Sequence, residues 1–238
     1  MRARVILIIT VVCLLELVLV LGGGYRLMNA RTVQVAGRLV DRVDTTEKVV
    51  ALTFDDGPTG AADAEAILET LADRGVRATF YLTGSGIEQF PDAAAELVDA
   101  GHELGNHTWS HPRMILLPPS RIAHEVSATD RLIRQAGYDG EISFRPPYGK
   151  KLLTLPLYLA ATQRTTVTWD VEADSEDSTG HSAEELAAAT VAGTRPGSII
   201  LLHPWYGRTA TRQAIGMIID DLHRQGYRFV TVSDLIHG

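Results

Sequence analysis

The chain has 238 residues, a length that suits one domain with a short appendage, and 22 Lys and Arg against 29 Asp and Glu give a formal net charge of −7. Four basic residues and one acidic residue lie in positions 1–31, so residues 32–238 keep 18 basic and 28 acidic side chains; this charge of −10 argues against a nucleic-acid partner, which needs a basic face. The single cysteine, Cys13, excludes an intramolecular disulfide, a cysteine-based zinc site and a cysteine nucleophile in the body.

The N-terminal segment is almost wholly apolar from Val5 to Leu21, interrupted only by Thr10 and Glu16. Its length lies at the short end of what spans a bilayer, about 17–25 residues, and exceeds the usual signal-peptide core of about 7–15 residues. Residues 1–24 are therefore predicted to be a signal anchor, with a cleaved signal peptide and a secreted protein as the alternative. The arginines before the segment place the N-terminus in the cytoplasm and the body outside the cell membrane.

Residues 25–47 have mixed polarity and no clear period, which is typical of an extracytoplasmic tether. From residue 48 the chain alternates between short β-branched or aromatic runs and stretches with helical spacing. The predicted strands are Val49–Phe54, Ala78–Leu82, His102–Leu104, Ile142–Arg145, Thr165–Trp169, Ser198–Leu202 and Arg228–Val232.

Helical spacing of apolar residues occupies the intervals between these runs. The predicted helices are Ala64–Leu71, Ile122–Ile133, Ala183–Val191 and Ala214–Leu222, and the expected helix ends carry Gly75, Gly101, Gly137 and Gly226. About seven repeats of strand and helix predict a parallel sheet with helices outside. Residues 48–238 are thus expected to form one α/β domain, open or closed into a barrel.

Unusual polar residues collect at the carboxyl ends of the predicted strands, the edge where parallel α/β folds build their sites. They are Asp55 and Asp56, His107 and His111, Arg145, Asp170 and Asp174, and His203. Their recurrence at five strand ends favours one functional site at this edge of the sheet.

A metal site is indicated by His107 and His111, which are four residues apart and can meet on one helical face or across one turn. Asp56 is the obvious third donor, and two histidines with one carboxylate and an open fourth position suit a hydrolytic zinc site. The adjacent pair Asp55 and Asp56 has a structural explanation too, since one of the two acids could cap the following helix. Two adjacent carboxylates repel each other, however, and a dication relieves the repulsion while the second carboxylate takes a proton from water.

At this point the sequence resembles the polysaccharide deacetylases, the NodB-homology enzymes of carbohydrate esterase family 4. The resemblance rests on four motifs in order: Lys48-Val-Val-Ala-Leu-Thr-Phe-Asp-Asp-Gly-Pro58, Gly101-His-Glu-Leu-Gly-Asn-His-Thr-Trp-Ser-His-Pro112, Phe144-Arg-Pro-Pro-Tyr-Gly149 and Gly197-Ser-Ile-Ile-Leu-Leu-His203. It extends over residues 48–236 and implies a distorted (β/α) barrel with about seven strands. It also implies metal-dependent removal of N-acetyl, and sometimes O-acetyl, groups from a glycan.

The resemblance also implies a role for each motif residue. Asp56, His107 and His111 would hold the metal, usually zinc in this family. Asp55 would be the general base and Arg145 its orienting partner. His203 would be the general acid supported by Asp174, and the backbone N–H of Tyr148 would help to stabilise the oxyanion.

Two positions depart from the family pattern. Ser175 stands where the family usually has Trp as a wall of the sugar pocket, and Trp205 follows Pro204 where an acid is more usual. We expect Trp205 to replace part of the lost wall and to contact the substrate.

The sequence therefore predicts a metal-dependent deacetylase that acts on peptidoglycan or another N-acetylglucosamine glycan. The alternative is a non-catalytic glycan-binding envelope protein on the same fold. The joint presence of the base, acid and metal-ligand residues argues against that alternative, because glycan binding needs no proton-transfer groups. A two-metal phosphoesterase is disfavoured because ligands for only one metal are found.

Overall fold

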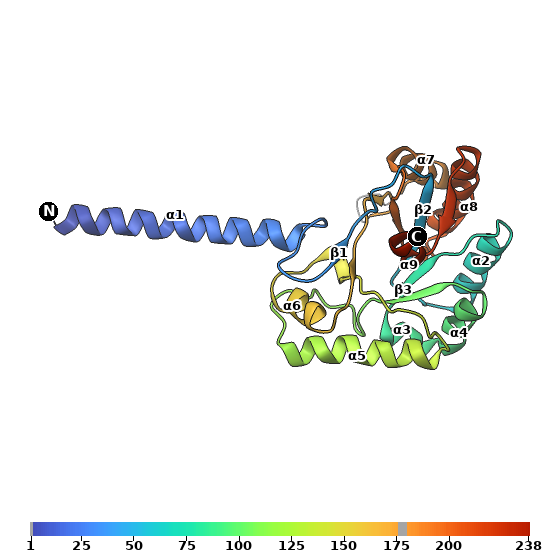
Figure 1. Ribbon diagram of the computed structural model, residues 1–238, viewed down its shortest axis with the longest axis horizontal. Helices are drawn as coiled ribbons and strands as arrows, with labels where there is room; N and C mark the ends of the chain where they lie inside the picture. Colours follow the sequence, from blue (N-terminus) through green and yellow to red (C-terminus); the bar gives the residue numbers. More distant parts are fainter. Residues whose placement is uncertain (1, 176–179) are drawn as a thin grey trace.

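A computed structural model describes residues 2–175 and 180–238 of the chain. A single long helix, α1 (Arg2–Asn29), projects from an α/β body (Figure 1). In chain order the body contains β1 (Leu39–Val40), β2 (Val49–Asp55), α2 (Ala61–Ala72), β3 (Thr79–Leu82), α3 (Gly84–Gln89), α4 (Pro91–Asp99), β4 (Glu103–Asn106), α5 (Pro119–Gln135), the 3-10 turn η1 (Pro147–Gly149), α6 (Thr154–Ala161), β5 (Thr166–Val167), β6 (Val171–Glu172), α7 (Ala183–Gly193), β7 (Ile199–Leu202), α8 (Thr209–Arg224), β8 (Arg228–Val230) and α9 (Val232–His237).

The strands pair in parallel throughout the described chain, in the order β4-β3-β2-β7-β6. β8 pairs with the first half of β2 and β3 with its second half, while β1 pairs with β5. Phe144 bridges the two groups, since it pairs in parallel with Asn106 at the end of β4 and with Thr166 in β5. The result is the distorted barrel that was expected, with helices outside it (Figure 1).

The core has two sides because alternate residues of a strand face opposite ways. Leu52 and Phe54 of β2 join Ile200 and Leu202 of β7 in the cluster covered by the outer helices. The intervening positions face the other side, where Ala51, Ile199 and Leu201 pack with Tyr81, Val167 and Trp169. Both faces of these central strands are therefore buried, as expected for a parallel sheet covered on each side.

The long predicted elements are confirmed, and all four predicted helix-ending glycines have the left-handed backbone that suits glycine there: φ is 61° at Gly75, 80° at Gly101, 95° at Gly137 and 86° at Gly226. The prediction of a strand at Ile142–Arg145 is wrong. The segment contributes only the Phe144 bridges, and Pro146 and Pro147 end the pairing at once because proline lacks the N–H that a ladder needs.

Part of the expected tether lies within the body. Leu39 and Val40 form β1, and Val43 N donates to Gly197 O at 2.9 Å. The two-residue strands β1 and β6 are too short for a periodic pattern, so the sequence did not predict them.

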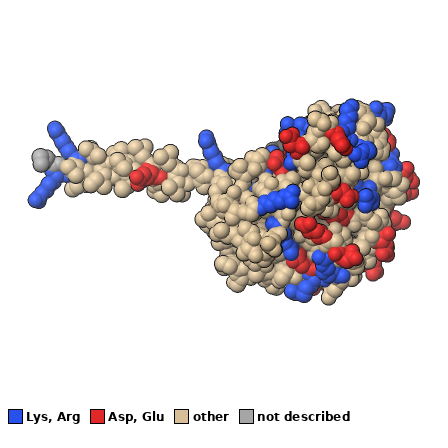
Figure 2. Space-filling model, in the orientation of Figure 1, with Lys and Arg blue, Asp and Glu red and all other residues tan. Residues whose placement is uncertain are grey.

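Helix α1 is long and apolar enough to cross a membrane: its candidate span is Arg4–Asn29, with a mean hydropathy of 3.1 and none of its most apolar stretch buried. Its surface is uncharged except near the ends and at one acidic side chain, Glu16 (Figure 2). Length and composition are the evidence for a span, and a signal sequence has the same features.

Candidate active site

A cleft of about 440 Å³ opens at the carboxyl ends of the strands. It brings together nearly all of the residues that the sequence singled out: Asp55, Asp56, His107, His111, Tyr148, Asp174, Ser175 and His203 line it. Arg145 lies behind Asp55 and is fully buried. These residues come from segments far apart in the chain, and the parallel topology places their strand ends at one edge.

Asp56, His107 and His111 form the cluster that fits a metal ion. Asp56 Oδ1 lies 3.3 Å from His107 Nε2 and 3.0 Å from His111 Nε2, and one ligand atom from each residue lies within 4.8 Å of the others. Asp56 Oδ1 is buried without a hydrogen-bond partner in the described chain, although both ring nitrogens are close. An orphaned carboxylate oxygen facing two imidazoles fits a shared divalent cation, and the nitrogen and oxygen donors suit zinc.

A backbone carbonyl on the far side of the ring from Asp56 orients His107. Its Nδ1 lies 2.8 Å from the carbonyl oxygen of Arg145, so this nitrogen donates there and Nε2 faces Asp56. A hydrogen bond of this kind fixes the tautomer of a metal-binding histidine. Burial would raise the pKa of Asp56, but His107 and His111 outweigh that effect and hold the pKa well below its usual range. Asp56 is therefore an anionic donor.

Several residues around the cleft have a left-handed backbone that is uncommon outside glycine. The φ angle is 77° at Asp56, 55° at His111 and 59° at Tyr148, and 69° at Thr108 in the histidine loop. Such conformations cost about 1–3 kcal/mol each and persist where the surroundings fix them. Three of the candidate site residues are thus held in conformations that the local sequence does not prefer.

The loop from His107 to His111 is held by residues that the sequence analysis missed. Glu125 of α5 is fully buried and accepts hydrogen bonds from Trp109 N at 2.9 Å and Ser110 N at 2.8 Å. Thr108 Oγ1 accepts from His111 N at 3.1 Å. A signal was available, because Glu125 occupies the apolar face of the predicted helix beside Ile122, where a charged side chain needs a specific reason to be buried.

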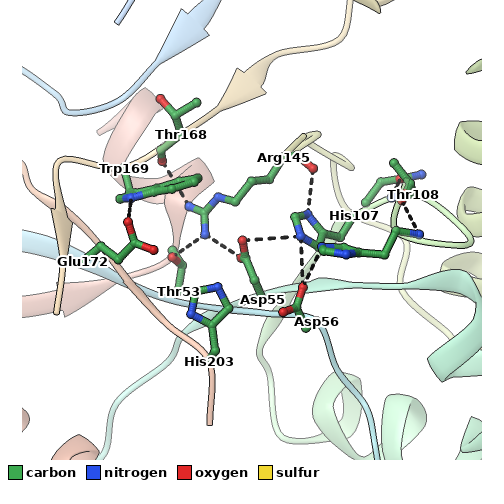
Figure 3. A network of polar contacts seen from close by, with 12 residues as sticks. Thr53, Asp55, Asp56, His107, Thr108, Arg145, Thr168, Trp169, Glu172 and His203 are labelled. Carbon is green, nitrogen blue, oxygen red and sulfur yellow. Dashed lines mark hydrogen bonds and ion pairs between the residues drawn. The ribbon is translucent and has the colours of Figure 1, made fainter. Parts of the chain in front are cut away.

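Asp55 is paired with Arg145, as the resemblance implied. Arg145 Nη1 donates to Asp55 Oδ1 at 2.7 Å and to Thr53 Oγ1 at 2.7 Å, and Nη2 donates to the Thr168 carbonyl at 3.1 Å. The guanidinium also stacks over Tyr81, 4.1 Å from the ring centroid. Figure 3 shows Asp55 between Arg145 on one side and His107 with Asp56 on the other, with His203 facing it. The arginine is therefore fixed, and it fixes the carboxylate.

His203 is held by Asp174 through two contacts. Asp174 Oδ2 accepts from the backbone N of His203 at 2.6 Å, and Oδ1 lies 3.0 Å from His203 Nδ1. Burial lowers the pKa of His203, but the hydrogen bond and charge of Asp174, with the charges of Asp55 and Asp56, outweigh it and raise the pKa to about 9. His203 is therefore protonated at neutral pH and can donate a proton.

Asp170 does not share this cleft. Its carboxylate accepts from Ile199 N at 3.0 Å and Ser198 Oγ at 3.0 Å, at the start of β7. It therefore organises the entry to that strand.

The prediction that Trp205 forms a wall of the sugar pocket is wrong. Its side chain is fully buried, packs in the main core near Phe80, and lies so close to Gly57 that a Cβ added there would clash with the indole. The turn after His203 directs the indole under the Asp56 loop and away from the cleft, where a large apolar ring buries more surface. Trp205 thus supports the site from beneath.

The sequence matches a family model described as Polysaccharide deacetylase over residues 42–167. A peptidoglycan-N-acetylglucosamine deacetylase of Bacillus cereus is 35% identical over 192 residues, which cover 78% of this chain and 67% of that protein. A peptidoglycan-N-acetylglucosamine deacetylase of Listeria monocytogenes is 32% identical over 193 residues, covering 80% of this chain; this chain spans only 39% of that relative's length.

Solved structures are similar as well. A crystal structure of a peptidoglycan N-acetylglucosamine deacetylase superposes with a TM-score of 0.77 at 30% identity, covering 83% of this chain and 92% of that one. A CE4 family pseudoenzyme from Bacillus anthracis superposes with a TM-score of 0.76 at 28% identity, covering 85% and 70%. The same fold thus occurs in an enzyme and in a pseudoenzyme, so the fold alone does not establish activity and the residues of the site decide it.

Proposed function

Because the chain belongs to the polysaccharide deacetylase family, we propose that it is a metal-dependent hydrolase that removes N-acetyl groups from a glycan containing N-acetylglucosamine, of the peptidoglycan type. The family supports the general activity, and relatives named as peptidoglycan deacetylases support the class of glycan. The observation that carries the proposal is the convergence in one cleft of a base held by Arg145, an acid held by Asp174 and a three-donor cluster that fits a cation.

Asp56, His107 and His111 would hold one divalent cation, with zinc as the proposed ion. When bound, the cation supplies Lewis-acid polarisation of the acetyl carbonyl and of water. The remaining chemistry belongs to side chains that the fold positions. Removal of the cation is expected to leave these side chains in place, because each has its own partners.

Asp55 is the proposed general base. It takes a proton from the attacking water as the water oxygen bonds to the acetyl carbon, and Arg145 keeps its carboxylate aimed into the cleft. The backbone N–H of Tyr148 would donate to the oxyanion that develops on the carbonyl oxygen. His203 then gives its proton to the sugar nitrogen as the C–N bond breaks, so that acetate and a free amine leave.

We further propose that residues 1–24 anchor the protein in a bacterial membrane and that the domain from residue 48 onward works outside it. The supporting observation is the long apolar, unburied helix that precedes the body. Such an anchor would restrict the enzyme to glycan close to the membrane. Cleavage after the apolar segment would instead release the same domain.

The test is acetate release by the full chain from N-acetylglucosamine oligosaccharides and from peptidoglycan, compared with the Asp55→Asn variant. Loss of a general base costs about 10²–10⁴-fold in rate, so the variant should be slower by that factor. Asp99→Asn, at an exposed position at the end of α4, is the matched control and should equal the parent. Glycan binding without any acetate release would favour the non-catalytic alternative.

A further inference from the structure

The four residues that end helix α1 and follow it, Met28–Arg31, lie along the rim of the cleft. Asn29 and Arg31 line the cleft together with Asp55 and Asp56. The backbone N of Lys151 donates to Met28 O at 3.4 Å, and Thr168 Oγ1 donates to Arg31 O at 2.6 Å. The segment that leads out of the apolar helix is thus hydrogen-bonded to the body at its two ends.

Two lysines hold the middle of this segment. Lys150 Nζ donates to the side chain of Asn29, and Lys151 Nζ donates to the carbonyl oxygen of Ala30. Lys151 is only 1% exposed, so its amine is buried where the body meets this segment. A cation beside the free carbonyls at a helix C-terminus is favourable. The docking of Met28–Arg31 therefore uses a buried, charged partner.

Thr168, which contacts this segment, also contacts Arg145, the residue that orients the proposed base. The Thr168 hydroxyl donates to Arg31 O, while the Thr168 carbonyl accepts from Arg145 Nη2 at 3.1 Å. Arg145 in turn holds Asp55. Two hydrogen bonds, both made by Thr168, therefore connect Arg31 to the arginine that orients the base.

The rim of the cleft is basic above an acidic floor. In the described chain, Arg31, Arg113, Lys150 and Arg208 line it with a single acid beside them, Glu172, while the other acids of the cleft are the proposed base, metal ligand and histidine partner. Basic side chains also lie on the body where α1 joins it (Figure 2). This gathering stands out because residues 32–238 carry a net charge of −10. It favours a substrate with a negative group beside the acetylated sugar.

Arg31 is the rim residue best placed to bind such a group. Its side chain is 48% exposed and lies over the ring of Trp169, 5.5 Å from the centroid. Its ion pair with Glu172 is long, at 3.4 Å, and contributes little at an exposed position. The planar guanidinium is thus oriented by an aromatic ring and still open to a ligand, and its fork of donors matches a carboxylate.

We propose that Met28–Arg31 forms one wall of the substrate cleft and that Arg31 determines specificity by binding a carboxylate on the glycan next to the sugar that is deacetylated. This inference rests on the proposed function for the identity of the glycan. N-acetylmuramic acid supplies such a carboxylate in peptidoglycan strands that have no stem peptide, because its lactyl carboxyl is then free and not bound in an amide, whereas an oligomer of N-acetylglucosamine alone has none.

The experiment measures dissociation constants for two tetrasaccharides, one of N-acetylglucosamine only and one alternating N-acetylglucosamine with N-acetylmuramic acid. Full-length protein is used in the Asp55→Asn background, so that neither glycan is consumed. Arg31→Ala should lower the preference for the carboxylate-bearing glycan about tenfold, the effect of one charged hydrogen bond. Arg31→Lys should retain part of the preference. Arg26→Ala, at an exposed arginine in the last turn of α1, should retain all of it.

Glu172→Gln provides the opposite change. Glutamine can still accept the hydrogen bond from Trp169 Nε1, which lies 2.9 Å from Glu172 Oε2, but it lacks the negative charge that pairs with Arg31. The preference for the carboxylate-bearing glycan should therefore increase. An equal loss of affinity for both glycans in Arg31→Ala, or no change in the preference, would overturn the inference even if the parent enzyme releases acetate. Selective loss in a protein that releases no acetate would uphold it and reject only the proposed function.

Discussion

Asp55 and Asp56 are adjacent in the chain, yet they serve different partners because the backbone turns between them. Asp55 still belongs to β2 and its side chain is buried against Arg145, whereas Asp56 has φ of 77° and turns toward His107 and His111. The left-handed residue thus separates a carboxylate suited to proton transfer from one suited to a cation. Neither role needs the two carboxylates to share a proton.

His203 and Asp174 give a prediction about pH. The pKa of His203 is raised to about 9, so the imidazolium is present below that value and is lost as the pH rises through it. In Asp174→Asn the hydrogen bond from the backbone of His203 keeps an acceptor, but the charge is gone and the pKa should fall. The alkaline limb of kcat/KM against pH should therefore move to lower pH.

The measurement is a pH profile of acetate release for the parent and Asp174→Asn, with Asp99→Asn as a charge-matched control that should leave the limb in place. An unmoved limb in Asp174→Asn would show that His203 is not the proton donor, or that Asp174 does not set its pKa.

Helices and strands with a sustained periodic pattern of apolar residues were predictable from the sequence. Those that form only through tertiary contacts were not. The helix over Ile122–Ile133 and the strands at β2 and β7 follow from apolar spacing alone. The strand predicted at Ile142–Arg145 has β-branched and aromatic residues, but the prolines that follow it leave a single bridging residue. β1 and β6 form because β5 and β7 offer an edge to pair with. The local sequence does not reveal that such an edge is available.

The candidate site was predictable to a similar extent. The charged and metal-binding residues fall in motifs, so sequence alone named Asp55, Asp56, His107, His111, Arg145, Asp174 and His203, and the structure brings them together. Thr53, Thr168 and Glu125 were missed because ordinary residue types act there through backbone and side-chain contacts. Trp205 was misplaced because its position after His203 says nothing about the direction of its side chain.

The position of Trp205 gives a prediction about stability. Its indole is fully buried beneath the loop that carries Gly57, so Trp205→Ala should lower the free energy of unfolding by about 3–5 kcal/mol. Trp205→Phe should cost less because it keeps most of the apolar volume. Thermal or denaturant unfolding measures both. A variant as stable as the parent but with a much higher KM for glycan would restore the rejected role as a wall of the sugar pocket.

Viewed as a whole, the molecule joins an apolar helix to a hydrolytic domain through a segment that borders the cleft (Figure 1). If α1 lies in a membrane, the docking of Met28–Arg31 fixes the cleft near the membrane surface, because only a few residues separate the end of the helix from the body. The same segment would then both limit the distance of the cleft from the membrane and form part of the cleft wall. The basic rim, on a body that is otherwise negative, would then direct anionic glycan to the cleft.

The most direct test of the account is the metal dependence of acetate release by the full chain. Chelation should abolish release of acetate from N-acetylglucosamine glycan, and added zinc should restore it as one ion binds per chain, because Asp56, His107 and His111 are the one cluster of this kind found in residues 2–175 and 180–238. His111→Ala should weaken zinc binding and require more zinc for the same rate. Full acetate release by chelated protein, with no zinc bound, would contradict the proposed mechanism.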